Sequence, residues 1–154
     1  MLNANQLFHR ISLSFFTTCL LLLLVSFISK SEGLTNDVLK YTNQFRKSKG
    51  LPALIMRDDL NAIADKHSED MAKGRCNFGH VGYEKREAQV KHIFQSCSMA
   101  ENVAYGASTG KEVVSLWKNS NGHRRNMLGS YKYIGIGIAR DHRGVVYYTQ
   151  IFVR

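Results

Sequence analysis

Length, composition and charge bound what this chain can be. It has 154 residues, and its 21 lysines and arginines against 12 aspartates and glutamates give a net charge of +9. A field of that sign favours anionic partners, such as envelope polymers or phospholipid head groups. The basic residues are scattered and follow no known nucleic-acid motif, so we expect a solvated basic surface and no nucleic-acid partner.

The first 33 residues have the features of an export signal. Arg10 gives a short basic start, residues 11–28 are almost wholly apolar or small, and residues 31–33 (Ser-Glu-Gly) fit a signal-peptidase site. We therefore predict cleavage after Gly33 and a secreted protein, extracellular or periplasmic, with no stable membrane span once cleaved. The alternative is an uncleaved anchor, because residues 11–28 reach the roughly 18 residues at which a spanning helix becomes possible.

Residues 34–154 are predicted to form one domain, which we expect to be monomeric. Their number falls in the usual size range of a single domain with one core. Loss of Arg10, Lys30 and Glu32 with the signal lowers the net charge by one unit, so the domain stays strongly basic.

Two cysteines lie in this domain, Cys76 and Cys97. An even number in an exported chain predicts a disulfide, which would stabilise the domain by roughly 3 kcal/mol in the chain-entropy model. The alternative is two unpaired thiols. The pair has no CxxC spacing, so we do not expect it to bind a metal by itself.

Two amphipathic helices are predicted first. Thr35 or Asn36 can cap one, and Asp58 or Asp59 can cap the next, which Gly74 ends. A histidine on an apolar stripe is more often structural than a ligand, so we expect His67 to be a hydrogen-bonded core residue. The two apolar faces are Val38, Tyr41 and Phe45, and then Leu60, Ile63, Ala64, His67 and Met71.

The middle of the chain alternates in character. Residues 84–95 predict a third, partly exposed helix, and residues 101–105 are compatible with a strand or a loop. Residues 111–120 predict a helix with Trp117 on its buried face, and Gly122 should break it.

The C-terminal part predicts an antiparallel hairpin. Residues 133–139 and 145–152 are rich in β-branched and aromatic residues, and residues 141–144 supply a turn. Gly135 and Gly137 leave one face of the first strand nearly bare, so another element, most simply a helix, should approach it closely. Helices followed by paired strands indicate an α+β domain.

Ordered sequence blocks run through this domain: 42–46 (Thr-Asn-Gln-Phe-Arg), 50–54 (Gly-Leu-Pro-Ala-Leu), 79–80 (Gly-His), 100–106 (Ala-Glu-Asn-Val-Ala-Tyr-Gly), 117–128 (Trp-Lys-Asn-Ser-Asn-Gly-His-Arg-Arg-Asn-Met-Leu) and 147–152 (Tyr-Tyr-Thr-Gln-Ile-Phe). In that order they resemble the CAP superfamily, also called the SCP domain, and its bacterial branch above all. The resemblance implies a three-layer α-β-α sandwich with a central antiparallel sheet.

The same resemblance implies a cleft. Family members of the animal and plant type carry two histidines and two acidic residues there, and His80 and Glu101 match the first of each. Ser120 and Tyr147 stand where the second glutamate and second histidine would be. His123, which the bacterial branch shares, lies one helical turn beyond Ser120 and can point toward the same cleft.

Two chemistries are open to these residues. His80, Glu101 and His123 could form a three-ligand zinc site with an open position, although their spacing carries no metal signature such as HExxH. The alternative is a hydrogen-bonded cluster that shapes the cleft. Ser120 beside His123 is a weak hydrolase candidate, because no nucleophile elbow or oxyanion hole is identifiable.

We therefore expect a secreted CAP-domain protein whose cleft binds a small ligand, lipid or envelope component, with or without a divalent metal. The alternative is a metal-dependent hydrolase that acts on peptide or envelope material through zinc-bound water. A third possibility is a basic structural or adhesion protein without a working cleft. Half of the family's tetrad is missing, so binding is favoured over catalysis.

Overall fold

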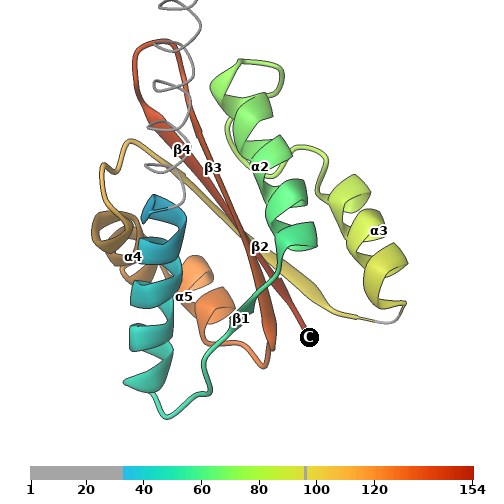
Figure 1. The fold of residues 1–154 in the computed structure, drawn as a ribbon, viewed down its shortest axis with the longest axis vertical. Helices are drawn as coiled ribbons and strands as arrows, with labels where there is room; N and C mark the ends of the chain where they lie inside the picture. Colours follow the sequence, from blue (N-terminus) through green and yellow to red (C-terminus); the bar gives the residue numbers. More distant parts are fainter. Residues whose placement is uncertain (1–32, 96) are drawn as a thin grey trace, which may run out of the picture. The chain divides into compact units, whose positions relative to one another are not determined.

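A sheet between two helical layers makes up the described part of the chain (Figure 1). This computed structural model describes residues 33–95 and 97–154, so the predicted export signal lies outside the described residues apart from Gly33. In chain order the elements are a helix over residues 33–47, β1 (Ile55–Met56), α2 (Asp58–Ala72), α3 (Tyr83–Phe94), β2 (Met99–Tyr105), α4 (Gly110–Lys118), α5 (Asn121–Met127), β3 (Tyr133–Arg140) and β4 (Val146–Val153).

The strands are ordered β1-β3-β4-β2. β3 and β4 form the predicted antiparallel hairpin, and β2, whose residues were compatible with strand or loop, pairs antiparallel with β4. The two-residue β1 adds a parallel edge beside β3 that the sequence did not predict. The α+β class and the central antiparallel sheet are thus confirmed.

Each face of the sheet has its own core. α2 and α3 cover one face, and the helix over residues 33–47 covers the other together with α4 and α5 (Figure 1). Trp117 lies in the second core at 1% exposure and donates from Nε1 to the carbonyl oxygen of Val103 at 3.2 Å, which confirms the predicted buried face. The first core contains Leu60, Ala64, Val90, Met99, Ile151 and Val153.

α2 packs directly on the bare face of β3, as the two glycines predicted. A Cβ atom on Gly135 would overlap the backbone of Leu60, and one on Gly137 would overlap the backbone of Ala64. Only glycine therefore permits this distance between helix and strand.

The close approach also satisfies the free edge of β3. In the part of β3 that follows the residues paired with β1, side chains of α2 take the place of a neighbouring strand. The backbone N–H of Ile136 donates to Asn61 Oδ1 at 2.8 Å, and that of Ile138 donates to Asp65 Oδ1 at 2.9 Å. Buried backbone donors need such partners, and a covered edge cannot pair with another chain. Burial raises the pKa of the Asp65 carboxyl.

The helix starts differ from the prediction. Thr35 and Asn36 lie inside a helix that is already formed at residue 33, so neither is its cap. Arg57 is the N-cap residue of α2, and Asp58 and Asp59 occupy the first turn, where negative charge complements the helix dipole.

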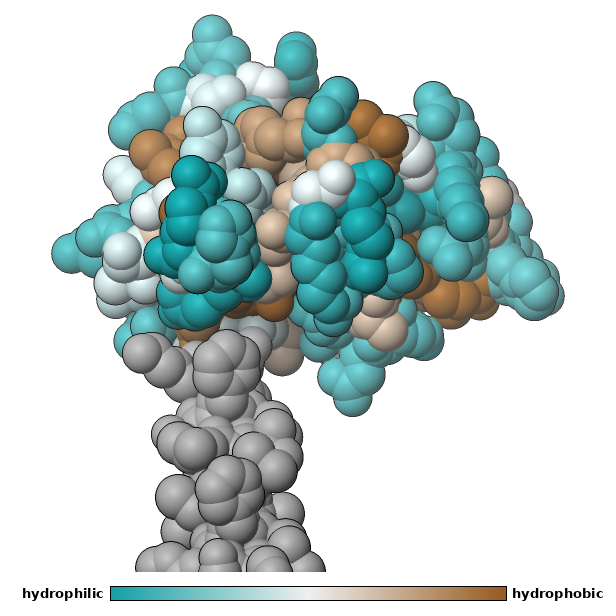
Figure 2. Space-filling view, turned by 90° about the horizontal axis from the view of Figure 1, so that it is seen from above, coloured by the Kyte–Doolittle hydropathy of each residue, from teal (hydrophilic) through white to brown (hydrophobic). Residues whose placement is uncertain are grey.

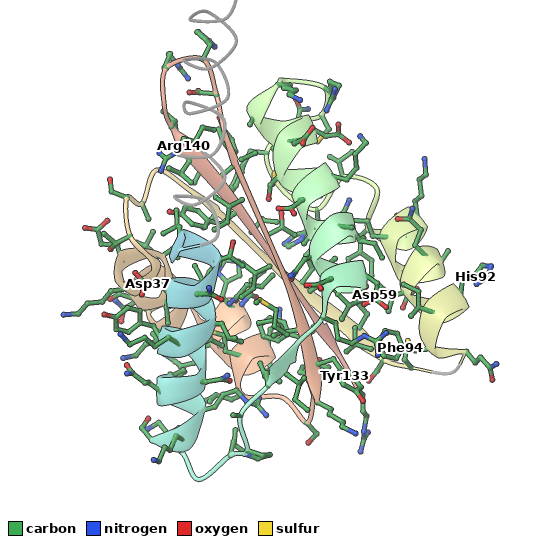
Figure 3. All side chains as sticks on the ribbon, viewed as in Figure 1. Asp37, Asp59, His92, Phe94, Tyr133 and Arg140 are labelled. Atoms are coloured by element: carbon green, nitrogen blue, oxygen red, sulfur yellow. The ribbon has the colours of Figure 1, made fainter. Side chains whose placement is uncertain are left out.

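Arg57 also links three elements. Its guanidinium lies 4.8 Å from the ring centre of Phe94 and 5.3 Å from that of Tyr133, and it pairs with Asp59. Figure 3 shows Asp59, Phe94 and Tyr133 gathered where α2 begins, α3 ends and β3 begins. This contact fixes one end of the α2–α3 layer on the sheet.

The break after Trp117 falls earlier than predicted. α4 ends at Lys118, Ser120 is the N-cap residue of α5, and Gly122 lies inside α5. The third predicted helix, over residues 84–95, is confirmed as α3.

The predicted disulfide is absent, because Cys76 and Cys97 are both free. Cys76 lines a hollow beside the first residues of α3, whereas Cys97 follows the end of that helix. Twelve helical residues span about 18 Å, and bridged cysteines have Cα atoms within about 7 Å. Burial raises the pKa of both thiols.

The surface in Figure 2 is mainly hydrophilic, with hydrophobic residues exposed between the charged ones. None of the helices among the described residues combines the length and hydropathy of a membrane span. The large hydrophobic residues that are most exposed are Ile55, Phe78, Val81, Ile93, Tyr105 and Leu116.

Candidate functional site

Glu101 lies at the centre of the candidate site. It belongs to β2, and its side chain is 1% exposed. Burial of a carboxylate is costly unless it is paired and hydrogen-bonded. Arg86 of α3 supplies the pairing, since Nε donates to Oε2 at 2.6 Å and Nη2 donates to Oε1 at 2.7 Å.

Arg86 is itself almost buried and makes two further contacts that hold the site together. Nη1 donates to the carbonyl oxygen of Val81 at 2.8 Å and to Nδ1 of His67 at 3.1 Å. The guanidinium therefore joins α2, α3, β2 and the loop between the two helices. Such a fork is rigid because its donors lie in one plane.

His80 lies in that loop and contacts the same carboxylate. Its Nδ1 lies 2.8 Å from Glu101 Oε1, while its side chain is 50% exposed. An ionised carboxylate only accepts, so the hydrogen-bond network assigns the shared proton to Nδ1. When the ring carries this one proton, Nε2 is free to accept a hydrogen bond from a ligand.

His67 supports His80 from behind. Nε2 donates to the carbonyl oxygen of Gly79 at 2.8 Å, and Nδ1 accepts from Arg86. Burial lowers the pKa of His67, and the positive charge of Arg86 lowers it further. The expected hydrogen-bonded core histidine is confirmed, and its bond to Gly79 positions the residue before His80.

His123 approaches from the opposite side of β2. Asn102 Nδ2 donates to the His123 carbonyl oxygen at 3.2 Å, and Asn126 Nδ2 donates to the Glu101 carbonyl oxygen at 3.1 Å. These bonds tie α5 to the strand beside the carboxylate. Burial lowers the pKa of His123, and its electrostatic interaction with His80 lowers that pKa further. Of the three predicted cleft residues, His80 and Glu101 are in contact, and the backbone of His123 is bonded to Asn102, the residue next to Glu101.

The other two predicted residues lie apart from this contact. Among the described residues, the Ser120 hydroxyl has no hydrogen-bond partner, so it forms no nucleophile–base pair with His123. Tyr147 pairs with Tyr105, and Ile151 with Glu101. The two positions are four residues apart along the strands, which places Tyr147 about 13 Å along the sheet from Glu101.

The arrangement does not suit a zinc site that includes Glu101. Both carboxylate oxygens accept from Arg86, whose positive charge would repel a cation, and His80 uses Nδ1 on the same carboxylate. In residues 33–95 and 97–154, no group of three His, Cys, Asp or Glu residues could hold a metal ion. Zinc binding by His80, Glu101 and His123 remains a prediction.

Arg86 is the residue that sequence reasoning missed. Its signal was available, since Tyr83, Arg86 and Val90 share one stripe of the α3 helix at i, i+3 and i+7. An arginine among apolar residues on a helix stripe needs a buried acceptor. Which acceptor it meets depends on the packing of α3 against β2, which the sequence does not display.

A family model for the cysteine-rich secretory protein family, CAP, matches residues 39–152. The chain belongs to the CAP family. This CAP domain is similar to the membrane protein YlbC of Bacillus subtilis, with 36% identity over 77% of this chain, and to YkwD of the same organism, with 36% identity over 65%.

Among solved structures, this CAP domain resembles an extracellular protein with an SCP domain from Bacillus anthracis. The TM-score is 0.69 at 26% sequence identity, and the match covers 80% of this chain and 41% of that protein. The chain likewise spans only 34% of YlbC and 40% of YkwD. The likeness therefore concerns the CAP domain and not the whole of these relatives.

Proposed function

We propose that this protein is an exported binding module that takes a small ligand, lipid or envelope component in the cleft at His80. The observation that carries the proposal is the buried ion pair of Glu101 and Arg86 beneath a half-exposed histidine. A buried ion pair is weak evidence for stability, since well-packed apolar residues of the same volume are often as stable. Its use here is to orient His80.

The orientation favours binding over turnover. Glu101 accepts two bonds from Arg86 and one from His80, so it is fixed as an acceptor. His80 is held at Nδ1 and directs Nε2 away from the carboxylate. Such preorganisation lowers the entropic cost of contacting a ligand.

The hydrolase alternative needs a metal-bound water, and the pairing of Glu101 with Arg86 does not favour it. Elemental analysis after gentle purification tests this alternative. Stoichiometric zinc that falls in both His80→Ala and His123→Ala would support a metal centre over the binding module.

Export is part of the same proposal. It is supported by the basic and apolar pattern of residues 1–33 and by the relative described as extracellular. The B. subtilis relative named a membrane protein supports the anchored alternative instead. Mass spectrometry of protein secreted by an expressing bacterium should give a chain that begins at Leu34, and an intact residue 1 in the membrane fraction would support the anchor.

The binding site itself can be tested by nuclear magnetic resonance of the histidine side chains. Soluble muropeptides and phosphatidylglycerol vesicles serve as probes. Signals of His80 should shift with one of them, and His80→Ala should weaken that binding at least tenfold. His92→Ala is the matched control, since His92 is exposed on the outer side of α3 (Figure 3). Equal binding by His80→Ala would contradict the proposed site.

A further inference from the structure

Three aromatic residues form a row on the sheet face that also carries Glu101. The ring centres of Phe78 and Tyr105 are 4.8 Å apart in an edge-to-face arrangement, and those of Tyr105 and Tyr147 are 5.7 Å apart and stacked. Phe78 is 48% exposed and Tyr105 is 54% exposed. Side chains of this size are usually buried further, so an exposed and ordered row indicates a contact surface.

One end of the aromatic row opens into a basic hollow. Tyr147 lines a hollow of about 440 Å³ together with Lys73, Arg140, His142 and Arg143. The Asp141 carboxylate in the same loop is already used, because it accepts from the backbone N–H groups of residues 143 and 145 and from the Arg143 guanidinium. Figure 3 shows Arg140 at this end of the sheet. Lys73 pairs with Glu69 and Arg143 pairs with Asp141, so the excess positive charge of the hollow is that of Arg140.

The other end of the row meets the proposed cleft. Phe78 lies two residues before His80, and Tyr105 lies four strand residues after Glu101. His80, the aromatic row and the basic hollow thus form one strip that follows β2 from Glu101 to Tyr105 and then crosses the end of the sheet over β4 and β3. A ligand that contacts all three parts must be extended, because the separation of Glu101 and Tyr105 alone is about 13 Å.

We propose that this strip binds an anionic glycan. The C–H faces of sugar rings are weakly positive and suit the exposed aromatic surface of Phe78 and Tyr105. Carboxylate or phosphate groups on the sugars would pair with Arg140 and Arg143, in keeping with the net charge of +9 on the chain. The inference rests on the proposed binding function where it places one end of the glycan at His80.

Other occupants fit the strip less well. A lipid tail requires an enclosed apolar pocket, whereas this row is open and two of its three members carry hydroxyl groups. A single-stranded nucleic acid needs cationic groups along the whole row of stacked bases. Here the arginines gather at one end, and Glu101 lies near the other.

The first test separates the two recognised features. Calorimetry at low salt compares tetragalacturonate, which has rings and charge, with maltotetraose, which has rings alone, and tripolyphosphate, which has charge alone. The proposal predicts that tetragalacturonate binds at least tenfold more tightly than either. Equal binding of maltotetraose or tripolyphosphate, or tighter binding of a fifteen-residue oligothymidylate, would overturn it. No binding of tetragalacturonate would overturn it as well.

The second test uses variants of the full chain. Tyr105→Ala and Arg143→Gln should each weaken tetragalacturonate binding about tenfold, and Tyr105→Phe should retain it. Both residues are exposed, so the fold should persist, as unchanged melting temperatures would verify. Leu116→Ala and Lys111→Ala, on exposed positions of α4, are the matched controls and should bind normally.

The same series distinguishes the two proposals. If His80→Ala abolishes binding and Tyr105→Ala and Arg143→Gln leave it unchanged, the glycan strip is refuted and the cleft at His80 is retained. If the two strip variants lose tetragalacturonate binding and His80→Ala does not, the aromatic and basic parts of the strip are supported without its His80 end, and the His80 cleft is decided by its own test with muropeptides and vesicles.

Discussion

Replacement of Arg86 by methionine would leave a buried charge almost alone. Glu101, at 1% side-chain exposure, would keep His80 as its side-chain partner among the described residues. Removing one partner of a buried ion pair typically lowers the free energy of unfolding by about 3 to 5 kcal/mol, because the other charge stays buried and uncompensated. The Val81 carbonyl group and His67 Nδ1 would also lose their donor, at about 1 kcal/mol each. We therefore expect Arg86→Met to lower the free energy of unfolding by about 4 kcal/mol or more.

The assay is urea unfolding at neutral pH with a double-mutant cycle. Arg86→Met, Glu101→Gln and the double variant are compared, and Lys85→Met on the same helix is the exposed control. The double variant leaves no unpaired charge. Its loss of unfolding free energy should therefore be smaller than the summed losses of the two single variants by about 2 kcal/mol or more.

Two results would refute this reasoning. One is a loss below about 1 kcal/mol in Arg86→Met, the range of an exposed salt bridge. The other is simple additivity in the cycle, since residues in one buried hydrogen-bond network should couple.

Three further predictions follow from single contacts. Gly137→Ala should destabilise the protein by about 3 kcal/mol or more, because its Cβ would overlap the backbone of Ala64. Gly122→Ala, in open space inside α5, should instead stabilise the protein by up to about 1 kcal/mol. Comparable urea midpoints for the two variants would contradict this. Burial holds the pKa of His67 below its ordinary value, so the contribution of His67 to stability is present above about pH 6.5 and is lost as the pH falls through the lowered pKa. His67→Gln should therefore flatten the decline of the free energy of unfolding between neutral and acid pH. An unchanged slope would argue against this. Thiol titration of the unfolded, unreduced protein should find both Cys76 and Cys97 of the described domain as free thiols. If neither reacts, the predicted disulfide is supported instead.

Local pattern was enough for much of the fold. The spacing of Val113, Val114 and Trp117 predicted the buried face of α4, and all three are at most 2% exposed. Gly135 and Gly137 predicted the close approach of a helix, because a missing side chain on a strand leaves a space that packing must fill. These features depend on residues that are near in sequence.

Contacts between distant residues escaped the sequence. Arg46 is 1% exposed and donates to carbonyl groups from 6 to 85 residues away, at Pro52, Met127, Gly129 and Tyr131, with burial lowering its pKa. The Phe-Arg pair in the 42–46 block gave no hint of these partners. The disulfide predicted from the even number of cysteines failed for the same reason, since counting cysteines does not reveal that α3 separates Cys76 from Cys97.

The candidate site was predicted in part. The family resemblance selected His80, Glu101 and His123; the fold brings His80 into contact with Glu101 and ties the His123 carbonyl group to the neighbouring Asn102. It gave no place to Arg86, because the guanidinium reaches Glu101 through the packing of α3 on the sheet. Without Arg86, the carboxylate looked available to a metal.

The central claim is that Glu101 orients His80 so that Nε2 faces the ligand. A long-range ¹H–¹⁵N spectrum of the histidine side chains at about pH 8.5, where imidazoles are neutral, measures this directly. The account predicts that His80 carries its proton on Nδ1, that Glu101→Gln changes this signal, and that Nε2 shifts when muropeptide or glycan binds. A proton on Nε2 of His80, unaffected by Glu101→Gln, would contradict it.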